Sequence, residues 1–277
     1  MNIQKIDLAG RIITLLTLAV AIVWAFPLYW ALVTTLKPEF EVVQPGLNLL
    51  PKTWTLEAYT HVLTTTKIGR WYVNSVVVSL VVTILVVLMG ALCGYALSQL
   101  RFRGRTLLWF TVLASFMVPI QALIVTHFVL MSQFGLINSW LGLILPQLIV
   151  PVVVIVYKQF FDSVPKDFRE AARVDGASEF DIFFRVYLPM NWGVTTALAI
   201  ITFIGAWNNF LWPFLVSTAE DTMTITVGIT QVKENFGVQY ARNLAAAVLA
   251  AMPVAIVYLI FQRRVTQAIM LSAGIKG

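Results

Sequence analysis

The side chains best suited to ligand binding within the apolar part of this sequence are amides and aromatic rings. Trp207, Asn208 and Asn209 follow one another in one apolar stretch, and Gln121 lies two residues after Pro119 in another. Amides exchange hydrogen bonds with hydroxyl groups, and aromatic rings offer flat apolar faces for stacking. These four residues are therefore candidates for a solute path. The alternative is that the amides bond to other helices of a bundle.

Few residues are suited to proton transfer, nucleotide binding or metal binding. Asp, Glu, Lys and Arg are absent from the depths of the apolar stretches, where His127 is the one candidate for a proton relay. The sequence has no GxxxxGK[ST] phosphate loop, and its single cysteine, Cys93, cannot form an intrachain disulfide or a cysteine-based zinc site. We therefore expect no catalytic residues, no metal and no cofactor in this chain. If the chain moves a solute uphill, the energy has to come from another subunit.

The composition indicates a membrane protein. Of 277 residues, 59% are hydrophobic and 12% are charged, and the mean hydropathy is +0.84. A soluble domain carries about 25% charged residues. The net charge of +6 reflects where Lys and Arg lie relative to a membrane, so we expect no nucleic acid as a partner.

Stretches free of Asp, Glu, Lys and Arg predict six membrane-spanning helices. One of them, residues 106–157, would be roughly 78 Å long as a single helix at about 1.5 Å per residue, so it has to turn back. The turn is expected at 132–142, where polar residues interrupt the run. The predicted fold is an all-α membrane protein, with residues 1–277 as one transmembrane domain. Its spans are 12–36, 71–98, 106–131, 142–161, 192–216 and 243–262.

Basic residues predict the orientation. With six spans, 13 of the 19 Lys and Arg residues lie on the side of the termini and 6 lie on the other. Lys and Arg concentrate on the cytoplasmic side of membrane proteins, so both termini are expected in the cytoplasm. The first apolar run is long and lacks a clear cleavage site after it, so we interpret it as an uncleaved span.

The charged segment 162–190 predicts two short helices joined at Gly176. Ser163 is a candidate N-cap for the first helix, and Gly176 can end that helix in the left-handed conformation. Ser178 and Asp181 have the spacing of a capping box for the second helix, which Pro189 is expected to close.

The side chains of this segment leave two interpretations open. Phe168, Ala171 and Ala172 are expected on one side of the first helix. The second helix is expected to gather four aromatic rings on one side: Phe180, Phe183, Phe184 and Tyr187. Such an elbow can dock into a groove on a soluble partner. It can also lie on the membrane surface with its Phe side chains buried in the headgroup region.

The segment resembles the EAA motif of binding-protein-dependent ABC importer permeases. In that family the motif forms coupling helices that sit in a cleft of the ATPase subunit. The resemblance implies ATPase-coupling roles for seven residues: Glu170, Ala171, Ala172, Asp175, Gly176, Phe184 and Pro189. Many members have a second proline four residues after the first, where this chain has Gly193.

The resemblance extends along most of the chain and is closest to the carbohydrate-uptake branch. It is carried by Asn74-Ser75, Gly94-Tyr95-Ala96, Phe102-Arg103-Gly104, the Trp207-Asn208-Asn209-Phe210 run and the ending Gly274-Ile275-Lys276-Gly277. The layout is similar to the smaller permease of the maltose-type pair. This implies a bacterial inner-membrane complex with a second permease, preferably a different chain, and two ATP-binding subunits that hold ATP and Mg. An extracytoplasmic solute-binding protein would deliver a sugar-like solute.

Two other classes of membrane protein are disfavoured by the residues present. A secondary carrier that works alone is disfavoured by the absence of charges within the spans. A membrane-embedded enzyme is disfavoured by the lack of a convergent acid, base or metal cluster.

The external segments 37–70 and 217–242 are candidates for contact with the binding protein, and the tail 263–277 is expected near the ATPase subunits.

Overall fold

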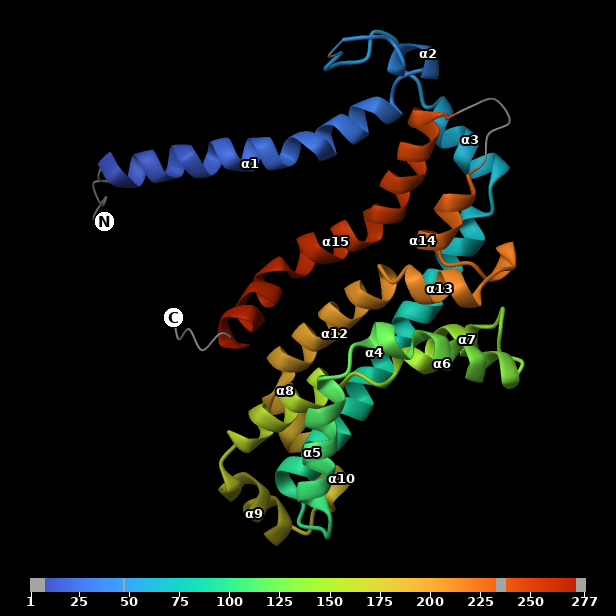
Figure 1. Ribbon diagram of the computed structural model, residues 1–277. Coiled ribbons are helices and arrows are strands. Elements are labelled where there is room, and N and C mark those ends of the chain that lie inside the picture. The colour runs from blue at the N-terminus through green and yellow to red at the C-terminus, as the bar shows by residue number, and fades with distance from the viewer. Residues whose placement is uncertain (1–7, 47, 233–237, 273–277) are drawn as a thin grey trace. The chain divides into compact units, whose positions relative to one another are not determined.

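The computed structural model describes residues 8–46, 48–232 and 238–272, and all regular secondary structure in these ranges is helical (Figure 1). The side chains of Arg263 and Arg264 and the ending Gly274-Ile275-Lys276-Gly277 lie outside the described part. The chain divides into two compact units. Unit 1 comprises residues 1–68 and 229–252, and unit 2 comprises residues 69–228 and 253–277.

Unit 1 contains the first long helix and the beginning of the last. Its helices are α1 (Leu8–Thr35), α2 (Glu39–Val42), α3 (Glu57–Thr65), η4 (Ile229–Gln231) and the first part of α15 (Tyr240–Ser272). The Glu39 carboxylate accepts hydrogen bonds from the backbone N–H groups of Tyr240 (2.8 Å) and Ala241 (2.9 Å). These groups have no partners within their own helix, so Glu39 caps α15.

A second carboxylate closes the segment between α2 and α3. Glu41 is buried and accepts hydrogen bonds from the backbone N–H groups of Lys52 (2.8 Å) and Thr53 (3.2 Å). The bond from the Lys52 N–H is the main reason that the pKa of Glu41 is lowered. Glu41 therefore ties α2 to the chain at Lys52 and Thr53.

Unit 2 contains a long central helix, α4 (Ile68–Gln99), around which shorter helices pack. These are α5 (Arg105–Phe116), α6 (Ile120–Gln133), α7 (Trp140–Ile144), η1 (Leu145–Gln147), α8 (Pro151–Asp162), α9 (Lys166–Val174), α10 (Glu179–Ile182), η2 (Phe183–Tyr187), α11 (Leu188–Met190), α12 (Trp192–Trp207), α13 (Leu211–Val216), η3 (Glu220–Thr222) and α14 (Ile225–Gly228), together with the rest of α15.

Two of the predicted spans, 106–131 and 142–161, are broken rather than continuous, and α12, which begins the predicted span 192–216, is bent against the end of the elbow. Among the described residues, three helices are long and apolar enough to cross a membrane, and the number rises to six if each bent pair forms one span. The bends measure 100° between α5 and α6, 49° between α7/η1 and α8, and 82° between the α10–α11 run and α12. Pro119 and Pro151 begin the second helix of the first two pairs because proline lacks the N–H that would continue the preceding helix. The predicted turn at 132–142 is confirmed between α6 and α7.

Glycines allow α8 to lie directly against α4. A Cβ atom on Gly90 would come within 2.5 Å of Val153 Cγ1, and a Cβ atom on Gly94 would come within 2.7 Å of Tyr157 Cβ. Small residues four apart let two helices approach closely, which is a common packing pattern in membranes. This contact places Val153 and Tyr157 in the core of unit 2.

Polar contacts attach the segment after α13 to the first turns of α4. The Asn74 side-chain amide donates to the carbonyls of Asp221 (2.9 Å) and Met223 (2.8 Å) and accepts from the indole N–H of Trp140 (3.0 Å). Ser75 Oγ accepts from the backbone N–H of Ile225 at 2.7 Å. Asn74 and Ser75 therefore have a structural role in unit 2.

Candidate functional site

The predicted elbow is present, and local hydrogen bonds define its corner. Gly176 has φ = +80°, and the backbone N–H groups of Gly176 and Ala177 donate to the carbonyls of Arg173 and Ala172, each at 3.0 Å. This is a Schellman motif, which favours glycine because other residues are strained at positive φ. Ser178 then caps α10 through the predicted capping box with Asp181. The prediction of a helix–Gly–helix corner is confirmed.

Two predicted helix boundaries are wrong. Ser163 does not cap α9. It follows the end of α8, its hydroxyl donates to the Phe160 carbonyl, and Pro165 is the N-cap of α9. Pro189 does not close the second helix, which continues to Met190 and breaks at Asn191. The π-helical turn of η2 precedes Pro189 and moves the carbonyl of Arg185, which a proline ring would meet in an α-helix.

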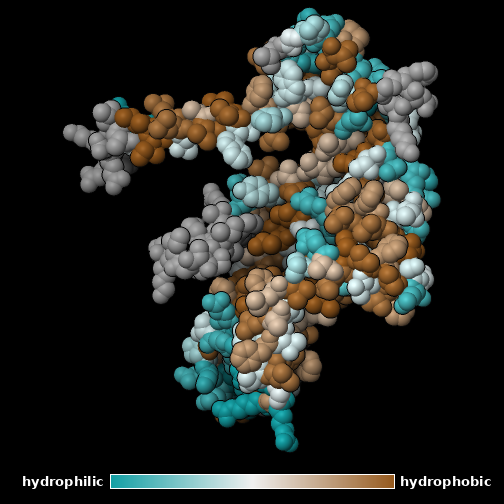
Figure 2. All heavy atoms as spheres, in the orientation of Figure 1, coloured by the Kyte–Doolittle hydropathy of each residue, from teal (hydrophilic) through white to brown (hydrophobic). Residues whose placement is uncertain are grey.

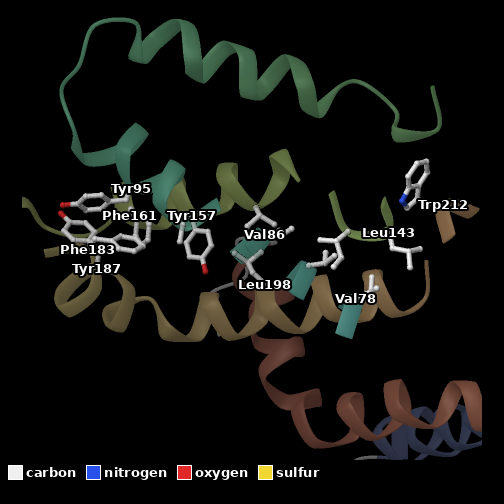
Figure 3. Close-up of a cluster of buried hydrophobic side chains, with 14 of the residues drawn as sticks. Val78, Val86, Tyr95, Leu143, Tyr157, Phe161, Phe183, Tyr187, Leu198 and Trp212 are labelled. Carbon is white, nitrogen blue, oxygen red and sulfur yellow. The ribbon is translucent and has the colours of Figure 1, made fainter. Parts of the chain in front are cut away.

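The aromatic side chains of the second helix do not share one side. Phe183 and Tyr187 are buried in the core of unit 2, whereas Phe180 and Phe184 are exposed. Figure 3 shows Phe183 and Tyr187 beside the rings of Tyr95 and Phe161 at one end of the core cluster. Phe183 and Tyr187 therefore anchor the elbow in the core, while Phe180 and Phe184 are exposed on its surface.

Most of the residues that resemble the EAA motif are exposed in this chain. Glu170, Ala171, Asp175, Gly176, Phe184 and Pro189 are exposed, while Ala172 is partly buried against the core cluster. The sequence analysis missed Val174, which is 89% exposed, because a single apolar residue beside charged ones carries little periodic signal. Figure 2 shows hydrophilic residues gathered at the end of unit 2 that α9 and α10 form, next to apolar helix surface.

A cavity of about 950 Å³ lies within unit 2, and two of the four candidate path residues line it. Gln121 and Asn209 both contribute to its wall, together with His127 and Trp212. The Asn209 side-chain N–H donates to Gln147 Oε1 at 2.8 Å, and Gln147 also lines the cavity. Gln147 was not predicted, although its place beside Pro146 in an apolar stretch was a usable signal. Most of the remaining wall is apolar.

The other two candidates lie elsewhere. Trp207 is buried, with its ring centroid 6.0 Å from that of Tyr72 and 5.9 Å from that of Phe203. Asn208 is exposed and ends α12. Neither residue lines the cavity. Among the described residues, no three His, Cys, Asp or Glu side chains gather closely enough to hold a metal ion.

The broken apolar helices and the helix–Gly–helix elbow are the features expected of a binding-protein-dependent importer permease. The chain belongs to the family described as binding-protein-dependent transport system inner membrane component, whose profile matches residues 86–270. It is therefore a multi-pass component of a bacterial inner membrane. ATPase activity in this family lies in partner subunits, and the family implies a partner permease and a solute-binding protein.

Curated relatives match over nearly the full length. The chain is 32% identical to the arabinooligosaccharides transport system permease protein AraQ of Halalkalibacterium halodurans, over 93% of both chains. It is 35% identical to the diacetylchitobiose uptake system permease protein NgcG of Streptomyces coelicolor, over 91% of this chain and 85% of that protein.

A solved structure shares the fold. The match has a TM-score of 0.84 at 22% identity and covers 95% of this chain and 98% of the other. That structure is described as a bacterial ABC transporter involved in the import of the acidic polysaccharide alginate. The predicted family is thus confirmed. The stand-alone carrier and the embedded enzyme receive no support from these comparisons.

Proposed function

We propose that this chain is one of two different permease subunits in an ATP-driven importer of a sugar or sugar-like solute. The permeases of arabinooligosaccharides and diacetylchitobiose transport that it resembles support this solute class. A relative from Yersinia pestis, 29% identical, belongs to sn-glycerol-3-phosphate transport, so the class includes sugar-like solutes. In this proposal two ATPase subunits bind ATP and Mg, and a binding protein delivers the solute.

The proposal has six spans: α1, α4, the bent pairs α5–α6 and α7/η1–α8, α12 with α13 after the elbow, and α15. Both termini and the elbow 162–190 then lie in the cytoplasm. The elbow docks into the ATPase subunit through its exposed residues: Glu170, Ala171, Asp175, Gly176, Phe184 and Pro189. Ala172 and the core beneath it support them. The observation that carries this assignment is the exposed left-handed corner at Gly176, where, apart from its chain neighbours, no atom of the described residues lies within 4 Å of an added Cβ.

The solute path is proposed along the cavity lined by Gln121 and Asn209. Four amide side chains, those of Gln121, Gln147, Asn191 and Asn209, in a mostly apolar wall offer a hydroxylated solute few hydrogen bonds. Such a wall suits passage of the solute better than tight retention. Trp207 and Asn208 were predicted for the same path, and the burial of Trp207 against Tyr72 and Phe203 favours a packing role for that ring.

The docking role is tested by replacing Gly176. We expect Gly176→Arg to reach the membrane in normal amount and to abolish solute-stimulated ATP hydrolysis in the reconstituted complex. A large side chain at the corner would separate α9 and α10 from the partner surface. Open space around Gly176 means that the Arg side chain meets no core atom among the described residues, and the strain of a non-glycine residue at positive φ is confined to the corner.

The control variant is Gly176→Asn, because Asn tolerates positive φ better than other side chains. It introduces a side chain with little backbone strain and is expected to keep most of the stimulated ATP hydrolysis. Wild-type stimulation in the Gly176→Arg complex would show that the elbow does not dock at this corner.

A further inference from the structure

The carboxylate of Glu179 joins three helices at the base of the elbow. Glu179 Oε2 accepts a hydrogen bond from the hydroxyl of Tyr95 on α4 at 2.7 Å. Glu179 Oε1 accepts from Arg169 Nη2 (3.0 Å) and from Arg173 Nη2 (2.5 Å) and Nε (3.1 Å), both on α9. Glu179 itself belongs to α10. A single side chain thus connects α4, α9 and α10.

The surrounding rings fix the position of the Tyr95 hydroxyl. Tyr95 is 4% exposed, and its ring centroid lies 5.4 Å from that of Phe183, 5.1 Å from that of Tyr187 and 6.2 Å from that of Phe161. Figure 3 shows these four rings gathered together. Edge-on ring packing of this kind restricts rotation of the tyrosine. The hydroxyl therefore moves with α4 and with the core of unit 2.

Apart from Ala172, which packs against the core cluster, the first helix of the elbow is held mainly by polar contacts. No residue of α9 is buried. Among the described residues, the side-chain hydrogen bonds that α9 makes beyond itself go to Glu179. Hydrogen bonds between charged groups are stronger and more directional than neutral ones. A displacement of α9 consequently acts directly on Glu179 through these polar contacts.

We infer that Glu179 and Tyr95 form a mechanical link that carries movement of the elbow to the long helix α4. The inference rests on the proposed docking of the elbow, because docking is what would displace α9. Both residues act through position and touch neither solute nor nucleotide. Their loss should therefore reduce the solute moved per ATP hydrolysed and leave assembly of the complex intact.

Removal of one hydroxyl tests the link. Tyr95→Phe keeps the ring and removes the hydrogen bond to Glu179. In liposomes that contain the complete importer, we expect the amount of solute transported per ATP hydrolysed to fall by about twofold to tenfold, the range for the loss of one hydrogen bond. Co-purification of the ATPase subunit and unstimulated ATP hydrolysis should stay at wild-type levels.

Tyr187→Phe is the matched control. Tyr187 belongs to the same ring cluster, and its buried hydroxyl has no hydrogen-bond partner among the described residues. This variant should transport as much solute per ATP as the wild type. The link is refuted if Tyr95→Phe leaves that ratio unchanged, or if Tyr187→Phe lowers it equally.

A second variant tests whether both residues act through one bond. Glu179→Gln removes the charge that holds Arg169 and Arg173, and it should lower the same ratio. If the two residues form one link, the double variant should transport no less solute per ATP than the worse single variant. Fully additive losses would contradict the link. Failure of the wild-type chain to co-purify with an ATPase subunit would instead refute the proposed function.

Discussion

At the residue scale, the structure separates side chains that sequence reasoning had grouped together. Gln121 and Asn209 are 88 positions apart but line one cavity, whereas Trp207 and Asn209 are neighbours in sequence with different surroundings. Both residues present an amide to this wall, where a passing hydroxyl group can exchange a hydrogen bond with it. The buried Trp207 ring contributes to packing instead.

This difference predicts that substitutions at the amides change transport, whereas substitution at Trp207 changes stability. Gln121→Ala and Asn209→Ala should raise the solute concentration needed for half-maximal transport by about twofold to tenfold, because each loses a hydrogen bond. Trp207→Ala should destabilise the protein by about 3–5 kcal/mol, because it leaves a cavity in the core. Transport in liposomes and thermal unfolding of the purified protein measure the two effects.

The control for the amide variants is Gln133→Ala. Gln133 lies at the exposed end of α6, the helix that also carries Gln121, and it does not line the cavity. Its replacement should leave transport unchanged. If Gln121→Ala and Asn209→Ala also transport normally, the solute does not pass along this wall.

At the element scale, the packing of α8 on α4 depends on two glycines that face the partner helix. Gly90 and Gly94 are one turn apart, and each leaves no room for a Cβ atom. The same contact positions Tyr157 and Phe161, against which the aromatic base of the elbow is built. The stability of α4 and α8 as a pair therefore determines how firmly the elbow is held.

Gly94→Ala should destabilise the protein by about 1–3 kcal/mol, the usual effect of overpacking a close contact. The added methyl group would meet Tyr157 Cβ at 2.7 Å and the backbone nitrogen of Lys158 at 3.0 Å. Thermal unfolding followed by tryptophan fluorescence would measure the change.

Gly69→Ala is the comparison within the same helix. Gly69 has no neighbouring atom within 4 Å of an added Cβ and a backbone conformation that alanine can adopt. Replacing glycine by alanine in a helix removes backbone freedom from the unfolded chain, so the melting temperature should stay the same or rise slightly. Equal effects at the two positions would mean that α4 and α8 do not pack as described.

At the scale of the whole molecule, the surface of the single chain requires lipid or partner subunits. Large apolar side chains such as Trp24, Leu107 and Ile149 are mostly exposed. Figure 2 shows apolar residues over the helices of each unit and hydrophilic ones over the elbow. A water-soluble monomer rarely exposes continuous apolar surface of this kind.

The proposed orientation predicts which loops a membrane-impermeant thiol reagent can reach. In a Cys93→Ser background, Thr64→Cys on exposed α3 should be labelled in intact spheroplasts. Ser163→Cys at the base of the elbow should be labelled only after the membrane is permeabilised. The reverse pattern would place the elbow outside the cell and rule out its contact with a cytoplasmic ATPase.

The sequence by itself determined the features that depend on composition and on short-range bonds. The scarcity of charges indicated a membrane protein, the polar interruption indicated the turn before α7, and Gly176, Ser178 and Asp181 indicated the corner of the elbow. Their hydrogen bonds join residues five or fewer positions apart. Such bonds need no distant partner, so local rules predict them.

The tertiary structure alone decided which apolar side chains are buried and which distant residues meet. Tyr95 and Glu179 are 84 positions apart, and no local pattern pairs them. Phe183 and Phe184 have equal hydrophobicity, yet only Phe183 is buried in the core. Lipid, partner surfaces and protein core are all apolar, so periodicity cannot distinguish burial among them. That assignment follows from the packing of α4, α8 and the elbow in three dimensions.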